Sequence, residues 1–347
     1  MRLDVVPESW LERALLAAGA IPRPLAHTMI GMLMSRTILA AVKVGVFEEL
    51  QSGPQSAESI ASKCGMDRRA CEKILRALTG LGYVTAGAKG YELTPMSRKW
   101  LGSNTKSDLT EALLHRYLDM RLMNHAEEYL RSGESVDFHR NLSPDDWRVY
   151  VNGQRAQAAL TIPELVKRTP LPKGASAMLD LGGGHGLFAD AMCRKYPNLN
   201  AVVLDLPEAL SGIEPETVSD RVHFMVGDIL DPDFELDEYD LVFLGNLLHH
   251  FDESRCRGIV IHAARCVRKG GSCVVADFFH LGRSGSVAQI PALLDFYFAV
   301  TSGGGALDPD SVESWMREAG LGHVRTTKML SVPGMALVVG TRVVNKV

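Results

Sequence analysis

The stretch AMLDLGGGHG, from Ala177 to Gly186, decides how the second half of this 347-residue chain folds. An apolar segment, Ala177–Leu181, runs directly into a turn that contains four glycines. A glycine-rich turn between a strand and a helix lets a ligand approach backbone amides closely. The turn alone is ambiguous, because the glycines at 184 and 186 with Ala189 also fit the dinucleotide-binding fingerprint.

The sequence on either side of this turn predicts an α/β domain. Apolar strand-like segments alternate with helical ones, which indicates a mostly parallel, Rossmann-like sheet with helices on both faces. These segments are residues 177–181, 201–204, 222–226, 241–244 and 272–276. Two further strand-like segments, 323–330 and 335–340, flank Pro333 and Gly334 and predict an antiparallel hairpin at the edge of the sheet.

Three acidic residues come at the ends of three successive strands. Asp180 precedes the glycines, Asp205 ends the second strand, and Asp228 follows the third. A carboxylate at position 180 would repel a pyrophosphate but suits a cationic ligand, while the other two suit ribose hydroxyls and an adenine amine. The set predicts S-adenosylmethionine (SAM) as the cofactor. Its predicted contacts are Asp180, Gly182, Gly184, Gly186, Asp205, Leu206, Asp228 and Ile229.

Candidate catalytic residues follow the fourth and fifth strands. His249 and His250 lie in a strand-to-helix turn, and Asp252 is placed to cap the next helix. Asp277 ends the fifth strand. A histidine and an aspartate from neighbouring strand ends can form a base and the group that orients it. A structural role for either histidine stays open at this point.

The first half of the chain is predicted to be helical. Residues 11–18 and 29–44 are apolar-periodic and are separated by Pro22 and Pro24. Residues 55–100 predict a winged helix: a short helix at 57–63, a second helix with Ala70, Ile74, Leu75, Leu78 and Leu81 on its buried face, and a hairpin at 82–94. This unit carries eight basic and four acidic side chains, a net charge of +4. DNA binding and dimerisation are therefore both open for it.

Composition excludes several classes of protein. With 46% hydrophobic and 22% charged residues and a net charge of −4, the chain is an ordinary globular protein. The first eight residues lack an apolar signal core, and no uninterrupted apolar segment is as long as a membrane span. The six cysteines form no Cys-x-x-Cys pair, so neither a zinc ribbon nor a disulfide framework is indicated. The second half of the chain favours an enzyme over a DNA reader, and the net charge is negative, so we expect a cytoplasmic protein that binds neither nucleic acid nor membrane.

These motifs resemble the SAM-dependent small-molecule O-methyltransferases typified by the acetylserotonin, caffeate and hydroxyneurosporene enzymes. The family's Asp-Val-Gly-Gly-Gly-x-Gly falls on residues 180–186, its Leu-His-Asp-Trp-x-Asp on 248–253, and its Gly-Gly-x-Glu-Arg-Thr on 303–308. The resemblance covers nearly the whole chain. It implies His249 as the catalytic base, Asp277 as its acidic partner, and a homodimer built by the winged-helix half.

The chain departs from the family pattern at four positions. His250 replaces the usual Asp and Phe251 the usual Trp, Ala306 stands where a second acid is common, and Gly245 where Lys is common. These departures leave the acceptor atom open. C- or N-methylation is an alternative, and it could be assisted by a metal held by His249 and His250. A ligand-sensing regulator with a degenerate methyltransferase domain is an alternative from another class.

The sequence predicts three parts: a dimerisation domain at 1–104, a helical linker and acceptor-pocket segment at 105–172, and the SAM-binding domain at 173–347. We expect a small, flat, hydroxylated acceptor between the two domains. Its pocket is predicted to be lined by Met120, Met123, Trp147, Phe296 and Tyr297. No metal site is predicted.

Overall fold

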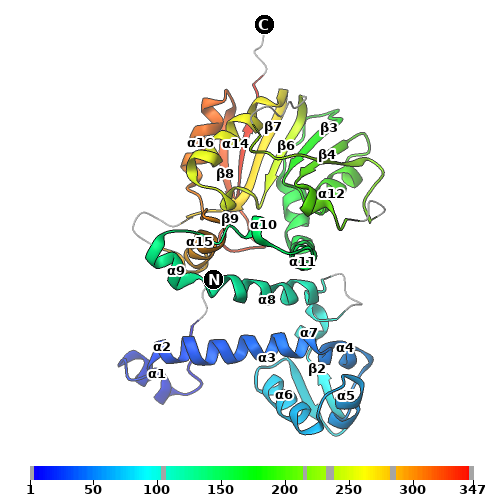
Figure 1. Cartoon of the computed structure of the whole chain (residues 1–347), viewed down its shortest axis with the longest axis vertical. Coiled ribbons are helices and arrows are strands. Elements are labelled where there is room, and N and C mark those ends of the chain that lie inside the picture. Colours follow the sequence, from blue (N-terminus) through cyan, green and yellow to red (C-terminus); the bar gives the residue numbers. More distant parts are fainter. Residues whose placement is uncertain (1–3, 103–106, 214–216, 232–237, 282–286, 344–347) are drawn as a thin grey trace. The chain divides into compact units, whose positions relative to one another are not determined.

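The computed structural model describes residues 4–102, 107–213, 217–231, 238–281 and 287–343 (Figure 1). Its contacts divide the chain into two compact units, Met1–Tyr117 and Leu118–Val347. The predicted segment 105–172 thus straddles the two units, and its treatment as a separate part stays a prediction.

The first unit contains the predicted winged helix. Ser56 accepts a hydrogen bond from the Ser59 amide and caps α5, and Asp67 caps α6 through the Ala70 amide. The hairpin strands β1 and β2 pair antiparallel. The elements of this unit are α1 (Trp10–Ala17), α2 (Arg23–Leu25), η1 (Ala26–Ile30), α3 (Gly31–Lys43), α4 (Val46–Glu49), η2 (Leu50–Ser52), α5 (Ala57–Lys63), α6 (Arg68–Gly80), β1 (Val84–Gly87), β2 (Gly90–Leu93), α7 (Pro95–Trp100) and the start of α8 (Thr110–Met123).

The predicted buried face of α6 was wrong at one end. Ala70 is exposed, and Cys71 is buried together with Leu75 and Leu78. Both Ala70 and Cys71 fit an apolar stripe at helical spacing, because a helix repeats every 3.6 residues and the pattern tolerates a shift by one. The hydrophobic core of the unit, formed by residues of α3 to α6, selects Cys71.

The apolar helix near the N-terminus is longer than predicted. Residues Arg23–Lys43 are helical throughout, because Pro24 occupies the first turn, where its missing N–H costs nothing. The helix has 21 residues, and an 18-residue window within it has a mean hydropathy of 1.4, enough by length and composition to cross a membrane. A core helix or a signal sequence passes the same test, so this one helix is weak evidence, and the expected absence of membrane binding stays a prediction.

The second unit contains the predicted sheet, with strand order β5-β4-β3-β6-β7-β9-β8. The first five strands run parallel, and β9 pairs antiparallel with β7 and β8 as predicted. The strands are β3 (Ala177–Leu181), β4 (Asn200–Asp205), β5 (Val222–Val226), β6 (Tyr239–Gly245), β7 (Val267–Phe278), β8 (Gly322–Lys328) and β9 (Met335–Thr341).

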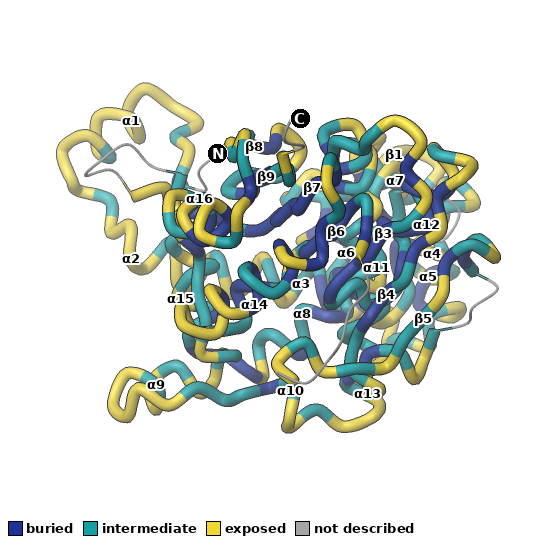
Figure 2. The backbone as a smooth tube through the Cα atoms, turned by 90° about the horizontal axis from the view of Figure 1, so that it is seen from above, coloured by how far each residue is buried: buried dark blue, intermediate teal, exposed yellow. Residues whose placement is uncertain are grey.

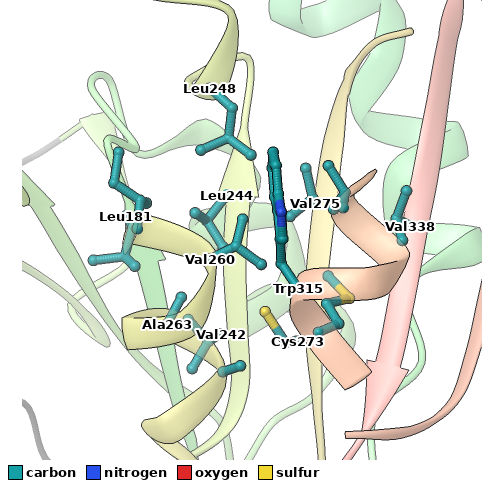
Figure 3. Close-up of a cluster of buried hydrophobic side chains, with 14 of the residues drawn as sticks. Leu181, Val242, Leu244, Leu248, Val260, Ala263, Cys273, Val275, Trp315 and Val338 are labelled. Atoms are coloured by element: carbon teal, nitrogen blue, oxygen red, sulfur yellow. The ribbon is translucent and has the colours of Figure 1, made fainter. Parts of the chain in front are cut away.

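Helices cover both faces of this sheet, as Figure 1 shows. Side chains of α14 (Glu253–Arg265) and α16 (Pro309–Glu318) pack on one face, and Trp315 lies against the cluster drawn in Figure 3. On the other face, α12 (Leu187–Lys195) and the end of α11 (Pro144–Arg168) pack around Phe243 and Val203. Buried residues run along β3, β6 and β7, whereas α1, α2 and α9 are largely exposed (Figure 2). The sheet is thus a rigid platform whose strand ends can hold a site.

The remaining helices of this unit lie near the carboxyl ends of the parallel strands. They are the end of α8, α9 (Ala126–Ser132), α10 (Phe138–Asn141), α13 (Pro207–Leu210), η4 (Leu248–His250) and α15 (Gln289–Ser302). The amide of Val136 donates to the carbonyl of Val300 at 2.9 Å, which fastens the segment before α10 to α15.

Candidate active site

The glycine turn after β3 is built as its sequence predicts. Gly182, Gly184 and Gly186 have φ angles of 65°, 47° and 69°, in the left-handed region that favours glycine. A Cβ on Gly182 would lie 2.6 Å from a Leu247 methyl group, so the turn after β3 and the turn after β6 are in close contact. The turn therefore brings the backbone of β3 next to the residues that precede His249.

Two carboxylates lie beside this turn. The Asp205 carboxylate accepts hydrogen bonds from the Gly184 and Leu206 amides, both at 2.8 Å. Asp180 is 2% exposed, and no residue in the described part of the chain donates a hydrogen bond to its carboxylate. Burial raises the pKa of Asp180 well above its ordinary range, and the neighbouring Asp205 raises it further. Burial also raises the pKa of Asp205, although the two amide hydrogen bonds oppose the rise.

A buried carboxylate without a donor is stabilised by a cation. The ammonium group and the sulfonium of SAM supply positive charge, and Asp180 therefore fits this cofactor. Asp228 is exposed two residues after β5 and accepts from the Leu230 amide at 2.9 Å, while Ile229 packs against the core. The predicted cofactor contacts thus lie at the carboxyl ends of three adjacent strands, β3, β4 and β5.

His249 and Asp277 form a buried pair at the ends of β6 and β7. The Nδ1 atom of His249 lies 2.6 Å from Oδ1 of Asp277, and the two residues are 3% and 0% exposed. Asp277 also accepts the amide of Phe278 at Oδ1 and the amides of Leu247 and Leu248 at Oδ2. Three backbone donors therefore hold this carboxylate in the orientation that meets the imidazole.

The backbone around His249 explains how its turn is formed. Asn246 has a φ of 53°, which bends the chain directly after β6, and its amide donates to the carbonyl of Ala276. Asparagine tolerates this left-handed conformation better than most residues. On the other side, a Cβ on Gly304 would overlap the carbonyl oxygen of His249. The phenyl ring of Phe298 stacks on the imidazole, with ring centroids 3.9 Å apart at 21°.

His250 lies next to a third histidine, which the sequence did not indicate. Its ring centroid is 4.2 Å from that of His249 and 4.5 Å from that of His139, on α10. His250 is partly buried and its Nδ1 lies 3.4 Å from Oγ of Ser302. The helix that starts after Asp252 therefore leaves His250 within the ring cluster. No motif could have identified His139, because it comes from a four-residue helix in a segment without a repeat.

The predicted acceptor-pocket residues all belong to the second unit. Trp147 is buried 5.6 Å from the His139 ring, and Tyr297 lies 5.4 Å from Phe298, so both join the ring cluster. Phe296 is 37% exposed and pairs with Tyr129 instead. Met120 and Met123 are half-buried on α8. Trp147 and Tyr297 therefore lie among the rings near His249, and the pocket role of the five residues stays a prediction.

One further residue near the cofactor loop was missed. Arg155 on α11 is partly buried and lies near His185. Burial lowers the pKa of the His185 imidazole to about 4, and the positive charge of Arg155 contributes to the decrease. Its position inside an unremarkable helical segment gave no signal. The metal-assisted alternative gains no support, because the described residues contain no group of three or more His, Cys, Asp or Glu side chains placed around a common ion.

Comparison with known proteins agrees with this geometry. Residues 116–322 match the family model of the O-methyltransferase domain, and residues 26–103 match that of the O-methyltransferase dimerisation domain. A 3-hydroxy-5-methyl-1-naphthoate 3-O-methyltransferase from Streptomyces sahachiroi is 27% identical over 92% of this chain and 95% of its own. A 3-amino-4-hydroxybenzoate 4-O-methyltransferase from Streptomyces cremeus is 26% identical, covering 86% of this chain and 84% of its own.

A solved structure shows the same fold. Human N-acetylserotonin methyltransferase in complex with SAM has a TM-score of 0.82 at 19% identity, covering 98% of this chain and 100% of that one. The family model alone spans more than half of the chain. The chain therefore belongs to the O-methyltransferase family, whose methyl donor is S-adenosylmethionine.

Proposed function

We propose that this enzyme methylates a hydroxyl group of a small, flat, largely apolar aromatic metabolite, with His249 as the general base. The observation that carries the proposal is the 2.6 Å contact between His249 Nδ1 and the Asp277 carboxylate. A carboxylate can only accept, so Nδ1 carries the hydrogen and Nε2 keeps its lone pair. No described residue hydrogen-bonds to Nε2, which leaves that atom available for the proton of the acceptor.

The chain's residues would do three things during the reaction. His249 would accept the hydroxyl proton as the acceptor oxygen attacks, and Asp277 would stabilise the imidazolium that forms. Phe298 would hold the imidazole in its plane, because the two rings are stacked. The bound SAM supplies a methyl group on a positively charged sulfur. Holding the acceptor in line with that methyl group accounts for much of the rate.

The cofactor would be held by residues on both sides of the glycine turn. Asp180 would face its ammonium group, Asp205 its ribose hydroxyls and Asp228 its adenine amine. Arg155 would pair with its carboxylate, since a half-buried guanidinium beside the turn has no ion-pair partner among the described residues. These assignments follow from charge and from the position of each residue at the sheet edge.

The names of two relatives support an aromatic acceptor. One is a methyltransferase of a hydroxynaphthoate and the other of an aminohydroxybenzoate, and both act on a ring hydroxyl. The rings around His249 are suited to contact an aromatic acceptor here, with Trp147 and Phe298 both largely buried. The acceptor itself stays unidentified.

We also propose that the enzyme is a homodimer. The dimerisation domain is matched, and its long helix exposes Met29, Ile30, Met32 and Leu33 to solvent. Exposed apolar side chains in such a group are commonly covered by a partner. Light scattering should give twice the chain mass at micromolar concentration, and a monomer there would contradict the proposal.

A panel of phenols and naphthols with isotopically labelled SAM tests the proposed reaction. Label should appear on an oxygen of the acceptor, and His249→Ala should lower kcat by about 10²–10⁴-fold while the affinity for S-adenosylhomocysteine (SAH) stays unchanged. His223→Ala, at an exposed position on β5, is the matched control. Label on carbon or nitrogen, or full activity in His249→Ala, would contradict the proposal.

A further inference from the structure

Three imidazoles lie in a row beside the catalytic turn. The centroids of His249 and His250 are 4.2 Å apart, and those of His250 and His139 are 4.5 Å apart at 87°. Trp147 packs at the outer end of this row, 5.6 Å from the ring of His139 and tilted by 31°, and Tyr150 packs edge-on to the same ring at 5.7 Å. Two histidines that the reaction scheme does not use are therefore next to the proposed base.

The position of His139 is fixed by the backbone around it. Besides the hydrogen bond from Val136 to Val300, the Asn141 side-chain amide donates to the carbonyls of Val136 and Asp137 at 2.8 and 3.1 Å. Asp137 itself has a left-handed φ of 47° and turns the chain into α10. The segment that carries His139 is thus fixed by hydrogen bonds, which keep its imidazole against that of His250.

Three of the four ring nitrogens of His139 and His250 have no hydrogen-bond partner among the described residues. Within the described part of the chain, His139 makes no hydrogen bond, and His250 makes only the 3.4 Å contact to Ser302. Among the described residues, the side-chain nitrogen and oxygen atoms that are fully buried and have no hydrogen-bond partner belong to Thr169 and Arg342, and not to either histidine. The unpaired imidazole nitrogens therefore keep some exposure to solvent, and their hydrogen-bonding capacity is unused by the described protein.

Both imidazoles are uncharged at neutral pH. Burial lowers the pKa of His139 to about 4, and the nearby His249 contributes to the decrease. Burial lowers the pKa of His250 well below its ordinary value, with smaller effects from His249 and His139. A neutral imidazole offers one N–H donor and one nitrogen acceptor. This pair can therefore bind a group that both accepts and donates, such as a hydroxyl, or one that only accepts, such as a carbonyl.

We infer that His139 and His250 determine acceptor specificity: they bind an uncharged hydroxyl or carbonyl adjacent to the hydroxyl that is methylated. This inference rests on the proposed function, because it places the acceptor oxygen at His249. Neighbouring rings on the protein then meet neighbouring substituents on the acceptor. An adjacent carboxylate is disfavoured, because a neutral imidazole can donate one hydrogen bond to it but supplies no positive charge to offset the loss of its hydration.

The histidine at position 250, where the family usually has Asp, changes the charge beside His249. The family's usual Asp at position 250 would place a negative charge beside the base, whereas His250 leaves Asp277 as the charged carboxylate at the turn, and Asp277 is occupied by His249 and three amides. At position 250 the protein therefore presents a neutral polar ring in place of a negative charge.

The test compares three probes that differ in one substituent: catechol, phenol and salicylate. The SAH-bound full-length enzyme is titrated with each at pH 7, and affinity is read from the NMR shifts of the histidine ring protons. We expect catechol to bind at least about tenfold more tightly than phenol, with salicylate the weakest. His139→Phe and His250→Phe keep a ring but remove both nitrogens, so each should reduce the catechol preference to less than about threefold while phenol affinity is retained.

Two controls separate this role from a structural one. His139→Gln keeps a hydrogen-bond donor and an acceptor at this position, so it should retain part of the catechol preference that His139→Phe loses. His223→Phe should leave the preference unchanged. Equal affinities for catechol and phenol in the parent enzyme, a preference that survives both Phe variants, tightest binding of salicylate, or no binding of any probe would overturn the inference. A catechol preference that depends on His139 and His250 but comes without methyl transfer would retain their binding role and reject the proposed function. Methyl transfer without the preference would do the reverse.

Discussion

Replacing Asp277 by Asn tests whether the carboxylate sets the tautomer of His249. In the parent enzyme, Oδ2 accepts the amides of Leu247 and Leu248, at 3.2 and 2.9 Å, and Oδ1 accepts the amide of Phe278 and the imidazole, at 2.7 and 2.6 Å. An asparagine has one oxygen and one NH2 group for these two positions. Its orientation is therefore determined by how many donors the NH2 group must face.

An NH2 group in place of Oδ2 would face two backbone N–H donors, and in place of Oδ1 it would face one backbone donor and the imidazole. The second arrangement conflicts with fewer donors, because the imidazole can change its tautomer. Nδ1 of His249 would then accept, and the hydrogen would move to Nε2. That tautomer cannot accept the proton of an acceptor hydroxyl, so the base is lost although the side chain keeps its shape.

We expect Asp277→Asn to lower kcat by about 10²–10⁴-fold, the range associated with a positioned general base. Affinity for SAH should change by less than about threefold, because the carboxylates proposed to hold the cofactor lie in β3, at the end of β4 and after β5. The assay is steady-state methyl transfer with SAH calorimetry alongside. Asp252→Asn is the matched control, since Asp252 is an exposed cap of α14 and asparagine caps equally well.

The reasoning fails if Asp277→Asn retains kcat within about threefold of the parent value. It also fails if a far more reactive acceptor, already ionised at the assay pH, shows the same loss as a phenol of ordinary acidity. An ionised acceptor needs no base, and the variant should transfer methyl to it at nearly the parent rate.

Three further results are expected. Asp205→Ala should weaken SAH binding by about tenfold or more, measured by calorimetry, because charge-assisted hydrogen bonds to the cofactor are lost. Burial would raise the pKa of Glu164, but hydrogen bonds from backbone amides, including that of Leu330, and from a guanidinium lower it to about 2 from an ordinary 4.5. The stabilisation by the ionised Glu164, at most about 3 kcal/mol, is thus complete above pH 4.5 and lost as the pH falls toward 2. In denaturation experiments, the free energies of unfolding of Glu164→Gln and the parent should therefore differ at neutral pH and become equal in acid. Gly304→Ala should lower kcat and the melting temperature together, because its methyl group would overlap the His249 carbonyl; unchanged values in both assays would contradict that contact.

The parts of the fold that follow from local sequence were predictable. A buried parallel strand is an apolar segment flanked by turn residues, and Ala177–Leu181 and Val222–Val226 end in the structure where the pattern ended. The pairing of His249 with Asp277 was also predictable, because both follow adjacent parallel strands and such strand ends meet at one edge.

Other features depend on packing that no local pattern contains. His139 meets His250 only because the segment before α10 is bonded to α15, more than 150 residues later in the chain. Arg155 reaches the cofactor turn because α11 packs against α12. On α6, the choice between Ala70 and Cys71 is made by the surrounding core and not by the spacing, which fits both.

The three imidazoles at the sheet edge differ in which of them can carry a positive charge. In the proposed reaction, methyl transfer from a sulfonium to a hydroxyl would leave one positive charge on His249, and Asp277, 2.6 Å away, would stabilise it. A second positive charge on either neighbouring ring would oppose that step, since like charges a few ångströms apart repel strongly in a poorly solvated site. Burial and the nearness of His249 keep His139 and His250 neutral. The three imidazoles can thus share one site because only the one that contacts a carboxylate takes up the charge.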